Sequence, residues 1–165
     1  MVRNRDNSDV PSPLLTLDQL NEMLFDGIAH AGAIGGGMGG GAPGASGGAK
    51  GGRFGARHFT RLDGEQQVFP IPRSDASQQA VRIDFFGDGV LEETEEPSAS
   101  QDATLKILGV VGSGTMNMNP CIVQIVWSPS ELHAFAHARE GVFKQRTCTK
   151  ALQRLGEVVD AAGQR

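Results

Sequence analysis

The strongest constraint on the fold is an almost unbroken apolar run from Cys121 to Trp127, which begins directly after Pro120. A run this short and this rich in β-branched residues is typical of a strand that is buried on both faces. The next four residues, Ser128 to Glu131, place a serine before a proline and a glutamate shortly after it, which predicts the capped start of a helix. We therefore expect a central strand that leads directly into a carboxyl-terminal helix.

Further strands are predicted on the amino-terminal side of this run. Asp63-Gly64 is a dipeptide that favours a tight turn, so the residues around it predict a β-hairpin. Val81, Ile83 and Phe85 alternate with polar residues, as in a strand with one wet face, whereas the glutamates of residues 92–96 predict a solvated acidic loop. Residues 105–111 predict one more apolar strand. The fold class is therefore α+β, with an antiparallel sheet of about five strands, an amino-terminal amphipathic helix and a carboxyl-terminal capped helix packed on the sheet.

The amino-terminal third of the chain differs in composition from the rest. Thr16 to Gln19 forms a capping box that opens an amphipathic helix, predicted over residues 16–30. Thirteen of the 23 glycines fall between Ala31 and Ala56, and so glycine-rich a segment predicts a flexible tether. The predicted organisation is a disordered amino terminus (1–15), the amphipathic helix (16–30), the tether (31–56) and a single α+β domain (57–165).

The predicted carboxyl-terminal helix changes character along its length. Its basic residues continue the pitch of its early apolar face, while its later apolar residues lie on a second face, so we expect a break or bend near Gly141 or Thr147. The basic stripe consists of Arg139, Arg146, Lys150 and Arg154. The apolar anchors that we expect to contact a partner are Leu152, Leu155 and Val159.

These features favour a non-enzymatic binding or adaptor subunit of a larger assembly. The expected contacts with other protein subunits are a sheet edge, to which a partner strand adds, and the carboxyl-terminal helix. The alternative is binding of RNA or single-stranded nucleic acid, in which the basic stripe holds phosphates and the glycine-rich segment with Arg53 and Arg57 adds contacts. A net charge of −4 counts mildly against that alternative.

A third hypothesis is an enzyme that binds a dinucleotide. Residues 108–116 carry Gly109, Gly112 and Gly114, and their spacing resembles the strand and turn that open the dinucleotide-binding domain of 3-hydroxyacyl-CoA dehydrogenases. The resemblance implies that the turn from Gly109 to Thr115 contacts a pyrophosphate. A β-rich run follows where that family has a helix, so this hypothesis ranks last and we expect no enzyme.

No cofactor or metal site is expected. His133 and His137 have a spacing that places two imidazoles on one helix face, but the sequence supplies no further ligand. Cys121 and Cys148 lack metal-ligand spacing and fit a reducing, intracellular compartment. Because the chain shows neither a secretory signal nor the roughly 20 apolar residues of a membrane span, we expect a soluble protein, in the cytoplasm.

Overall fold

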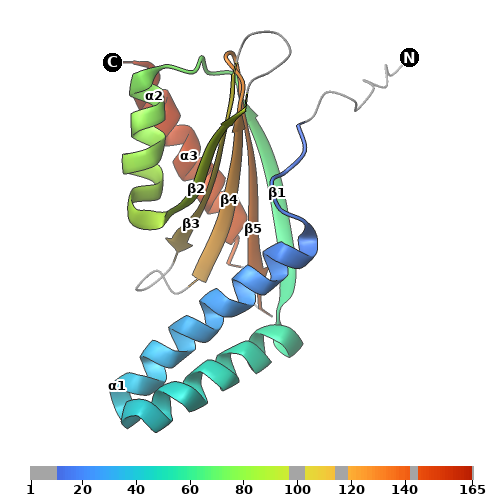
Figure 1. The fold of residues 1–165 in the computed structure, drawn as a ribbon, viewed down its shortest axis with the longest axis vertical. Helices are drawn as coiled ribbons and strands as arrows, with labels where there is room; N and C mark the ends of the chain where they lie inside the picture. Colours follow the sequence, from blue (N-terminus) through green and yellow to red (C-terminus); the bar gives the residue numbers. More distant parts are fainter. Residues whose placement is uncertain (1–10, 97–102, 114–118, 142–144, 165) are drawn as a thin grey trace, which may run out of the picture.

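The protein is built on a five-stranded antiparallel sheet with the strand order β1-β5-β4-β3-β2. The computed structural model describes residues 11–96, 103–113, 119–141 and 145–164, and Figure 1 shows their arrangement. The strands are β1 (Arg61–Phe69), β2 (Val90–Glu96), β3 (Thr104–Ser113), β4 (Asn119–Trp127) and β5 (Leu132–Glu140). The helical elements are α1 (Leu17–Phe59), α2 (Asp75–Ala80), the π-helical turn η2 (Val81–Phe86), the 3₁₀ turn η3 (Gly87–Gly89) and α3 (Thr147–Gly163). The predicted α+β fold is confirmed.

β4 is the central strand, as the apolar run predicted. It pairs with β3 on one side and with β5 on the other, and its residues from Cys121 to Trp127 are all buried. Its odd-numbered side chains join the main core, which lies between the sheet and the helices η2 and α3. Trp127 is completely buried in this core, and its indole nitrogen donates a hydrogen bond to the carbonyl oxygen of Ile71 at 3.3 Å.

The opposite face of the sheet carries a smaller core at the base of α1. Leu20 and Leu24 of α1 pack on Leu108 of β3 and Ile122 of β4, and all four side chains are buried. Because side chains alternate between the two faces along a strand, Leu108 and Ile122 point away from α3. The amino-terminal helix therefore packs on its own sheet.

The predicted helix start at Ser128 is wrong, because the residues after it form β5. Ser128 and Glu131 close a tight turn in which the Ser128 N–H donates to the Glu131 carbonyl at 3.0 Å and the Glu131 N–H donates to Ser128 Oγ at 3.1 Å. A helix N-cap makes the same side-chain bond, so the local signal fits both structures. Beyond the turn, Ala134, Ala136 and Ala138 alternate on the face below α3, where their small side chains are fully buried.

The β-hairpin predicted around Asp63-Gly64 is also wrong, because β1 runs straight through both residues. Gly64 pairs with His137 of β5, and a Cβ atom added at Gly64 would lie 3.1 Å from Cδ2 of that imidazole. Glycine therefore leaves room here for the close approach of β1 to the His137 ring, and it does not form a turn.

Two further segments between β1 and β3 differ from the prediction. The predicted strand around Ile83 is the π-helical turn η2, which directs Val81, Phe85 and Phe86 into the main core and leaves Ile83 exposed. The glutamates of residues 92–96, predicted as a loop, belong to β2. β2 is an edge strand with exposed side chains, and such a position accepts charge without burying it.

The glycine-rich segment predicted as a flexible tether is helical. α1 consists of two arms, residues 17–40 and 42–59, which reverse direction at Gly41, whose φ is 61°. The arms lie side by side and project beyond the end of the sheet (Figure 1). A Cβ atom at Gly36 would lie 2.2 Å from the carbonyl oxygen of Gly44, and one at Gly48 would lie 2.1 Å from that of Gly32. Glycine at these positions lets the two backbones touch, and this contact gives the segment the packing that its composition lacks.

α3 begins at Thr147, one of the two positions at which a break was expected, but the segment before the break is a strand instead of a helix. Arg146, the residue before α3, has a left-handed φ of 54°, which is uncommon for a non-glycine residue. α3 then crosses the face of the sheet opposite the base of α1. The two helices therefore cover different faces of one sheet.

Candidate protein-binding surface

β1 forms an open edge of the sheet. Its nine residues pair with β5 in an unbroken register from Arg61 to Phe69, and within the described residues no strand pairs with its other side. In an antiparallel pair, alternate residues direct their backbone groups to the neighbour, so the remaining N–H and C=O groups of β1 point outward. Residues 64–68 are exposed, and Val68 adds an apolar side chain that is 49% exposed. This edge is a template for an additional strand.

The other edge of the sheet, β2, has the features that normally prevent strand addition. Its pairing with β3 is interrupted by a register shift between Val90 and Glu92. Its glutamates form ion pairs: Glu93 with Arg82, Glu95 with Arg73 at 3.1 Å and Glu96 with Lys106 at 2.6 Å. Charged side chains and irregular pairing both discourage the approach of a further strand. The two edges of the sheet are therefore chemically different.

Arg139 of β5 fixes the position at which α1 passes into β1. Its guanidinium group donates to Thr60 Oγ1 at 2.8 Å, to the Thr60 carbonyl at 2.9 Å and to the Ala56 carbonyl at 3.2 Å. It also donates to Asn21 Oδ1 at 2.6 Å and lies over the ring of Phe25 at 4.3 Å. Burial lowers the pKa of Arg139 from its usual value, but the group stays charged at neutral pH. One side chain thus connects both arms of α1 to the sheet.

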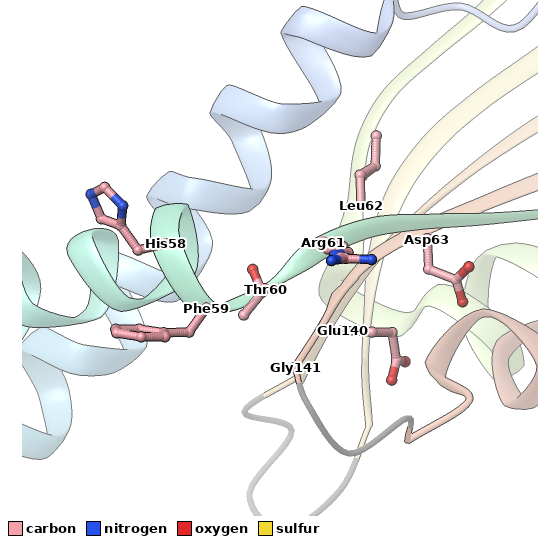
Figure 2. A pocket seen from close by; sticks show the side chains of 8 residues that line it. All are labelled: His58, Phe59, Thr60, Arg61, Leu62, Asp63, Glu140 and Gly141. Carbon is pink, nitrogen blue, oxygen red and sulfur yellow. The ribbon is translucent and has the colours of Figure 1, made fainter.

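A cleft of about 590 Å³ opens where β1 begins. Figure 2 shows the side chains that line it, which come from the end of α1, the start of β1 and the end of β5. They are His58, Phe59, Thr60, Arg61, Leu62, Asp63, Glu140 and Gly141. Phe59 is 68% exposed, and the His58 ring contacts Phe54 with a centroid distance of 4.4 Å. The cleft therefore lies at the start of β1 and places the exposed ring of Phe59 beside it.

Glu140 lines this cleft, and its carboxylate binds the backbone at the start of α3. Its carboxylate accepts hydrogen bonds from the backbone N–H of Thr147, at 2.8 Å, and from that of Gln145. Burial by itself raises the pKa of Glu140, but hydrogen bonds from the Thr147 hydroxyl and from these backbone amides outweigh burial, so the pKa is lower than usual. Glu140 is therefore a carboxylate at neutral pH and holds the start of α3.

The three apolar residues predicted to anchor a partner are in the core instead. Leu152, Leu155 and Val159 are each no more than 1% exposed, and they pack between α3 and the sheet. The sequence pattern located an apolar helix face correctly, but that face covers this protein's own sheet. The prediction that these three residues contact a partner is therefore corrected: they are buried against the protein's own sheet.

The six predicted nucleic-acid contacts lie in three separate places. Arg53 and Arg57 lie on the second arm of α1, where both form ion pairs with Glu22 and Arg53 also pairs with Asp26. Arg139 of β5 is half-buried against α1, as described above. The third group, at the start of α3, consists of Arg146, Lys150 and Arg154. The predicted continuous stripe from Arg139 onward therefore does not form. Arg139 belongs to the strand β5, whereas Lys150 and Arg154 belong to the separate helix α3.

The glycines that resemble a dinucleotide-binding turn are part of the antiparallel sheet. Gly109 and Gly112 lie in β3, which pairs antiparallel with β4 across a connection of residues 114–118. Five residues are too few for the helix of a parallel crossover unit. Gly114 and Thr115 lie outside the described residues. Within the described residues, the element after β3 is therefore the antiparallel strand β4 and not the helix that this motif requires.

His133 and His137 lie on β5, on the face away from α3. His133 Nε2 is 2.8 Å from the carboxylate of Glu131, and burial lowers the pKa of His137. Among the residues that the structure describes, no group of three or more His, Cys, Asp or Glu side chains is arranged to hold a metal ion.

Two features of the surface were missed from the sequence. Arg139 was assigned to a helix surface, although the alternation along residues 132–139 could have placed it on the polar face of a strand. The four-residue spacing from Gly32 to Gly36, and from Gly44 through Gly48 to Gly52, could have predicted two closely packed helical arms.

Comparison with known proteins adds no relative. No protein-family model, curated protein or solved structure matches this chain. In the part of the chain that the structure describes, none of the helices combines the length and apolar character needed to cross a membrane. Function must therefore be inferred from the surfaces themselves.

Proposed function

We propose that this protein is a non-enzymatic binding subunit that takes an extended segment of a partner protein along the outer edge of β1. The observation that carries the proposal is the unbroken nine-residue edge of β1, which contrasts with the interrupted and charged edge of β2. A partner strand forms backbone hydrogen bonds with this edge, each of which contributes about 1 kcal/mol.

The surroundings of β1 support the same function. Exposed residues 64–68 leave the edge accessible, and the cleft at its start has room for side chains of the partner beside Phe59. Arg139 and the two arms of α1 hold this end of β1 in place, so the edge is ordered before a partner arrives. A preformed edge lowers the entropic cost of association.

Two neighbouring residues of β1 allow a matched test. Along an antiparallel strand, successive N–H groups point alternately to the neighbour and outward, so one of Gln66 and Gln67 directs its N–H to β5 and the other directs it to solvent. We expect one of the variants Gln66→Pro and Gln67→Pro to remain folded and the other to lose about 3 kcal/mol of stability. Gln66→Ala and Gln67→Ala keep both N–H groups and serve as controls.

The measurement is capture of partner proteins from a cell extract, followed by titration of the purified partner with each variant. The proposal predicts that wild-type protein and both alanine variants bind with similar Kd, whereas the folded proline variant binds at least about tenfold more weakly. Equal affinity of the folded proline variant would exclude the β1 edge as the binding site. A mass above that of the monomer, lost in the same variant, would identify the partner as a second copy of this chain.

A second candidate, nucleic-acid binding, is favoured by the group of cations at the start of α3. Arg146, Lys150 and Arg154 are exposed. Lys150 and Arg154 are four residues apart on α3 and so lie on one side of that helix, and Arg146 directly precedes the helix. Binding to labelled single-stranded RNA at two salt concentrations tests this candidate. It predicts affinity that falls steeply with salt and is lost in an Arg146/Lys150/Arg154→Glu variant. No binding at low salt would exclude it.

A further inference from the structure

The two cysteines of the chain meet in the main core, between β4 and the first turn of α3. Cys121, Ala138 and Asp63 form one row across β4, β5 and β1. Cys148 lies over that row, because its thiol donates to the Asp63 carbonyl oxygen at 3.6 Å, and it is near enough to the Cys121 thiol to raise the pKa of that group. The Cys121 thiol itself donates to the carbonyl oxygen of Ile122 at 3.9 Å. Both cysteines are free, and each is no more than 1% exposed. Ala138, with only a methyl group, leaves space for the two sulfur atoms.

A small cavity reaches Cys121 from the side of α3. It has a volume of about 170 Å³, which is enough for several molecules of the size of water. Its lining combines Val111, Gly112 and Cys121 of the sheet with Thr147, Lys150, Ala151 and Arg154 of α3. The cavity is therefore large enough for a molecule such as hydrogen peroxide, and Cys121, although 0% exposed, contributes to its wall, whereas Cys148 does not.

We propose that Cys121 and Cys148 are an oxidative modification site, at which a peroxide converts the buried pair of thiols into an intramolecular disulfide. The Cys121 thiol loses its proton, its thiolate attacks one oxygen of hydrogen peroxide, and the O–O bond breaks; the leaving hydroxide takes up that proton, so Cys121 sulfenic acid and water are formed. The Cys148 thiol then loses its proton, its thiolate attacks the sulfenic sulfur, and the S–O bond breaks; the leaving hydroxide takes up this proton as a second water. The two thiols lose two electrons and two protons, and peroxide is reduced to two molecules of water.

The same environment makes this reaction slow at neutral pH. The neighbouring Cys148 thiol and burial both raise the pKa of the Cys121 thiol, and only the thiolate is nucleophilic. The rate therefore rises as the pH increases. The product joins the central strand to the first turn of α3, a segment otherwise held by Glu140.

The experiment uses the full chain, reduced and then freed of reductant, and exposed to hydrogen peroxide at about pH 7 and about pH 9. We expect intact-mass analysis to show the loss of two hydrogens and peptide mapping to link Cys121 to Cys148. The disulfide should raise Tm by about 5–10 °C, because it closes a loop of the unfolded chain. Reaction at the higher pH should be at least about tenfold faster.

Two single variants separate the proposed order of events from random oxidation. In Cys148→Ala, a dimedone adduct should form on Cys121, because no second thiol removes the sulfenic acid. In Cys121→Ala, Cys148 should stay unmodified at the same peroxide concentration. Circular dichroism verifies that each variant is folded. Intermolecular disulfides, sulfinic acid without a cross-link, or wild-type thiols that stay reduced at both pH values would each overturn the proposal.

Discussion

A single guanidinium group, that of Arg139, holds both arms of α1 against the sheet. It is bonded to Asn21 on the first arm and to Ala56 and Thr60 at the end of the second. Hydrogen bonds to a charged group are stronger than neutral ones, and the carbonyl oxygens of Ala56 and Thr60 lose these donors if the group is removed. Arg139 is therefore the residue on which the placement of α1 and of the start of β1 depends.

We expect Arg139→Met to lower the free energy of unfolding by about 2–4 kcal/mol, because the apolar stem is kept while the charged donors are lost. Urea unfolding at neutral pH measures the change. Arg61→Met is the matched control, since Arg61 is exposed on β1, and it should change stability by less than about 0.5 kcal/mol. Similar small effects of both substitutions would contradict the structural function of Arg139.

The lowered pKa of Glu140 leads to a second prediction at the scale of a residue, on how stability depends on pH. A carboxylate whose pKa is lower in the folded state stabilises the protein above its ordinary pKa, here 4.5, and loses that contribution as the pH falls through the folded-state value. Glu140→Gln should cost about 1–3 kcal/mol at neutral pH, because the amides of Gln145 and Thr147 lose a charged acceptor. The difference from wild type should shrink below pH 4.5 in urea unfolding. A difference that is independent of pH would contradict this account.

At the scale of elements, the arms of α1 contain glycines of two kinds. A Cβ atom at Gly48 would meet the carbonyl oxygen of Gly32, whereas one at Gly47 would meet nothing within 4 Å. Only the first kind is needed for contact between the arms. The second kind carries the ordinary cost of glycine in an exposed helix, about 1 kcal/mol relative to alanine.

Neighbouring substitutions distinguish the two kinds of glycine. Gly47→Ala should increase helicity and stabilise α1 by up to about 1 kcal/mol, whereas Gly48→Ala should force the arms apart and reduce helicity. Circular dichroism at 222 nm during thermal unfolding measures both effects. If the two alanine variants behave alike, the arms are not in backbone contact.

The same scale explains which elements the sequence predicted. The buried β4 and the capping box at Thr16 are local signals, and the structure confirms both. β5 was missed because its alanines have high helix propensity. These small side chains fit beneath α3, and that contact involves residues further along the chain, so it cannot be read from the local sequence. The Ser128–Glu131 turn likewise makes a bond that a helix start also makes.

The candidate site was only partly accessible to sequence analysis. A sheet edge was expected to bind a partner, but which strand lies at the edge follows from long-range pairing, and the sequence does not encode that pairing locally. The expected anchors Leu152, Leu155 and Val159 share one apolar helix face, and periodicity alone does not distinguish a face that binds a partner from one that covers its own sheet.

At the scale of the whole molecule, the protein consists of a sheet that has a core on each face and of the two arms of α1, which project from it. Among the residues that the structure describes, twenty are buried in the main core below α3 and four in the core below α1, so α3 and the sheet carry most of the stability. The buried residues of α1 are Leu20, Leu24, Phe25 and Ala56, all near its two ends. The distal part of the arms therefore stands apart from both cores (Figure 1).

This division predicts that the distal arms can be removed without unfolding the sheet. Replacing residues 33–47 by a short glycine-serine loop joins Gly32 to Gly48, which are already in backbone contact, and leaves Arg139 and its partners in place. We expect the free energy of unfolding to change by less than about 1 kcal/mol, because none of the deleted residues is buried. The fluorescence of Trp127, the one tryptophan of the chain, reports on the main core during urea unfolding.

Leu24→Ala is the control for this deletion, because it acts at the base of α1 and should cost about 2–5 kcal/mol. If the deletion costs as much as Leu24→Ala, the distal arms are part of the cooperative fold. If the deletion is tolerated and partner binding at β1 is also unchanged, the arms serve an interaction other than the one at the β1 edge. Loss of partner binding in a stably folded deletion variant would instead place the arms and the edge in one binding surface.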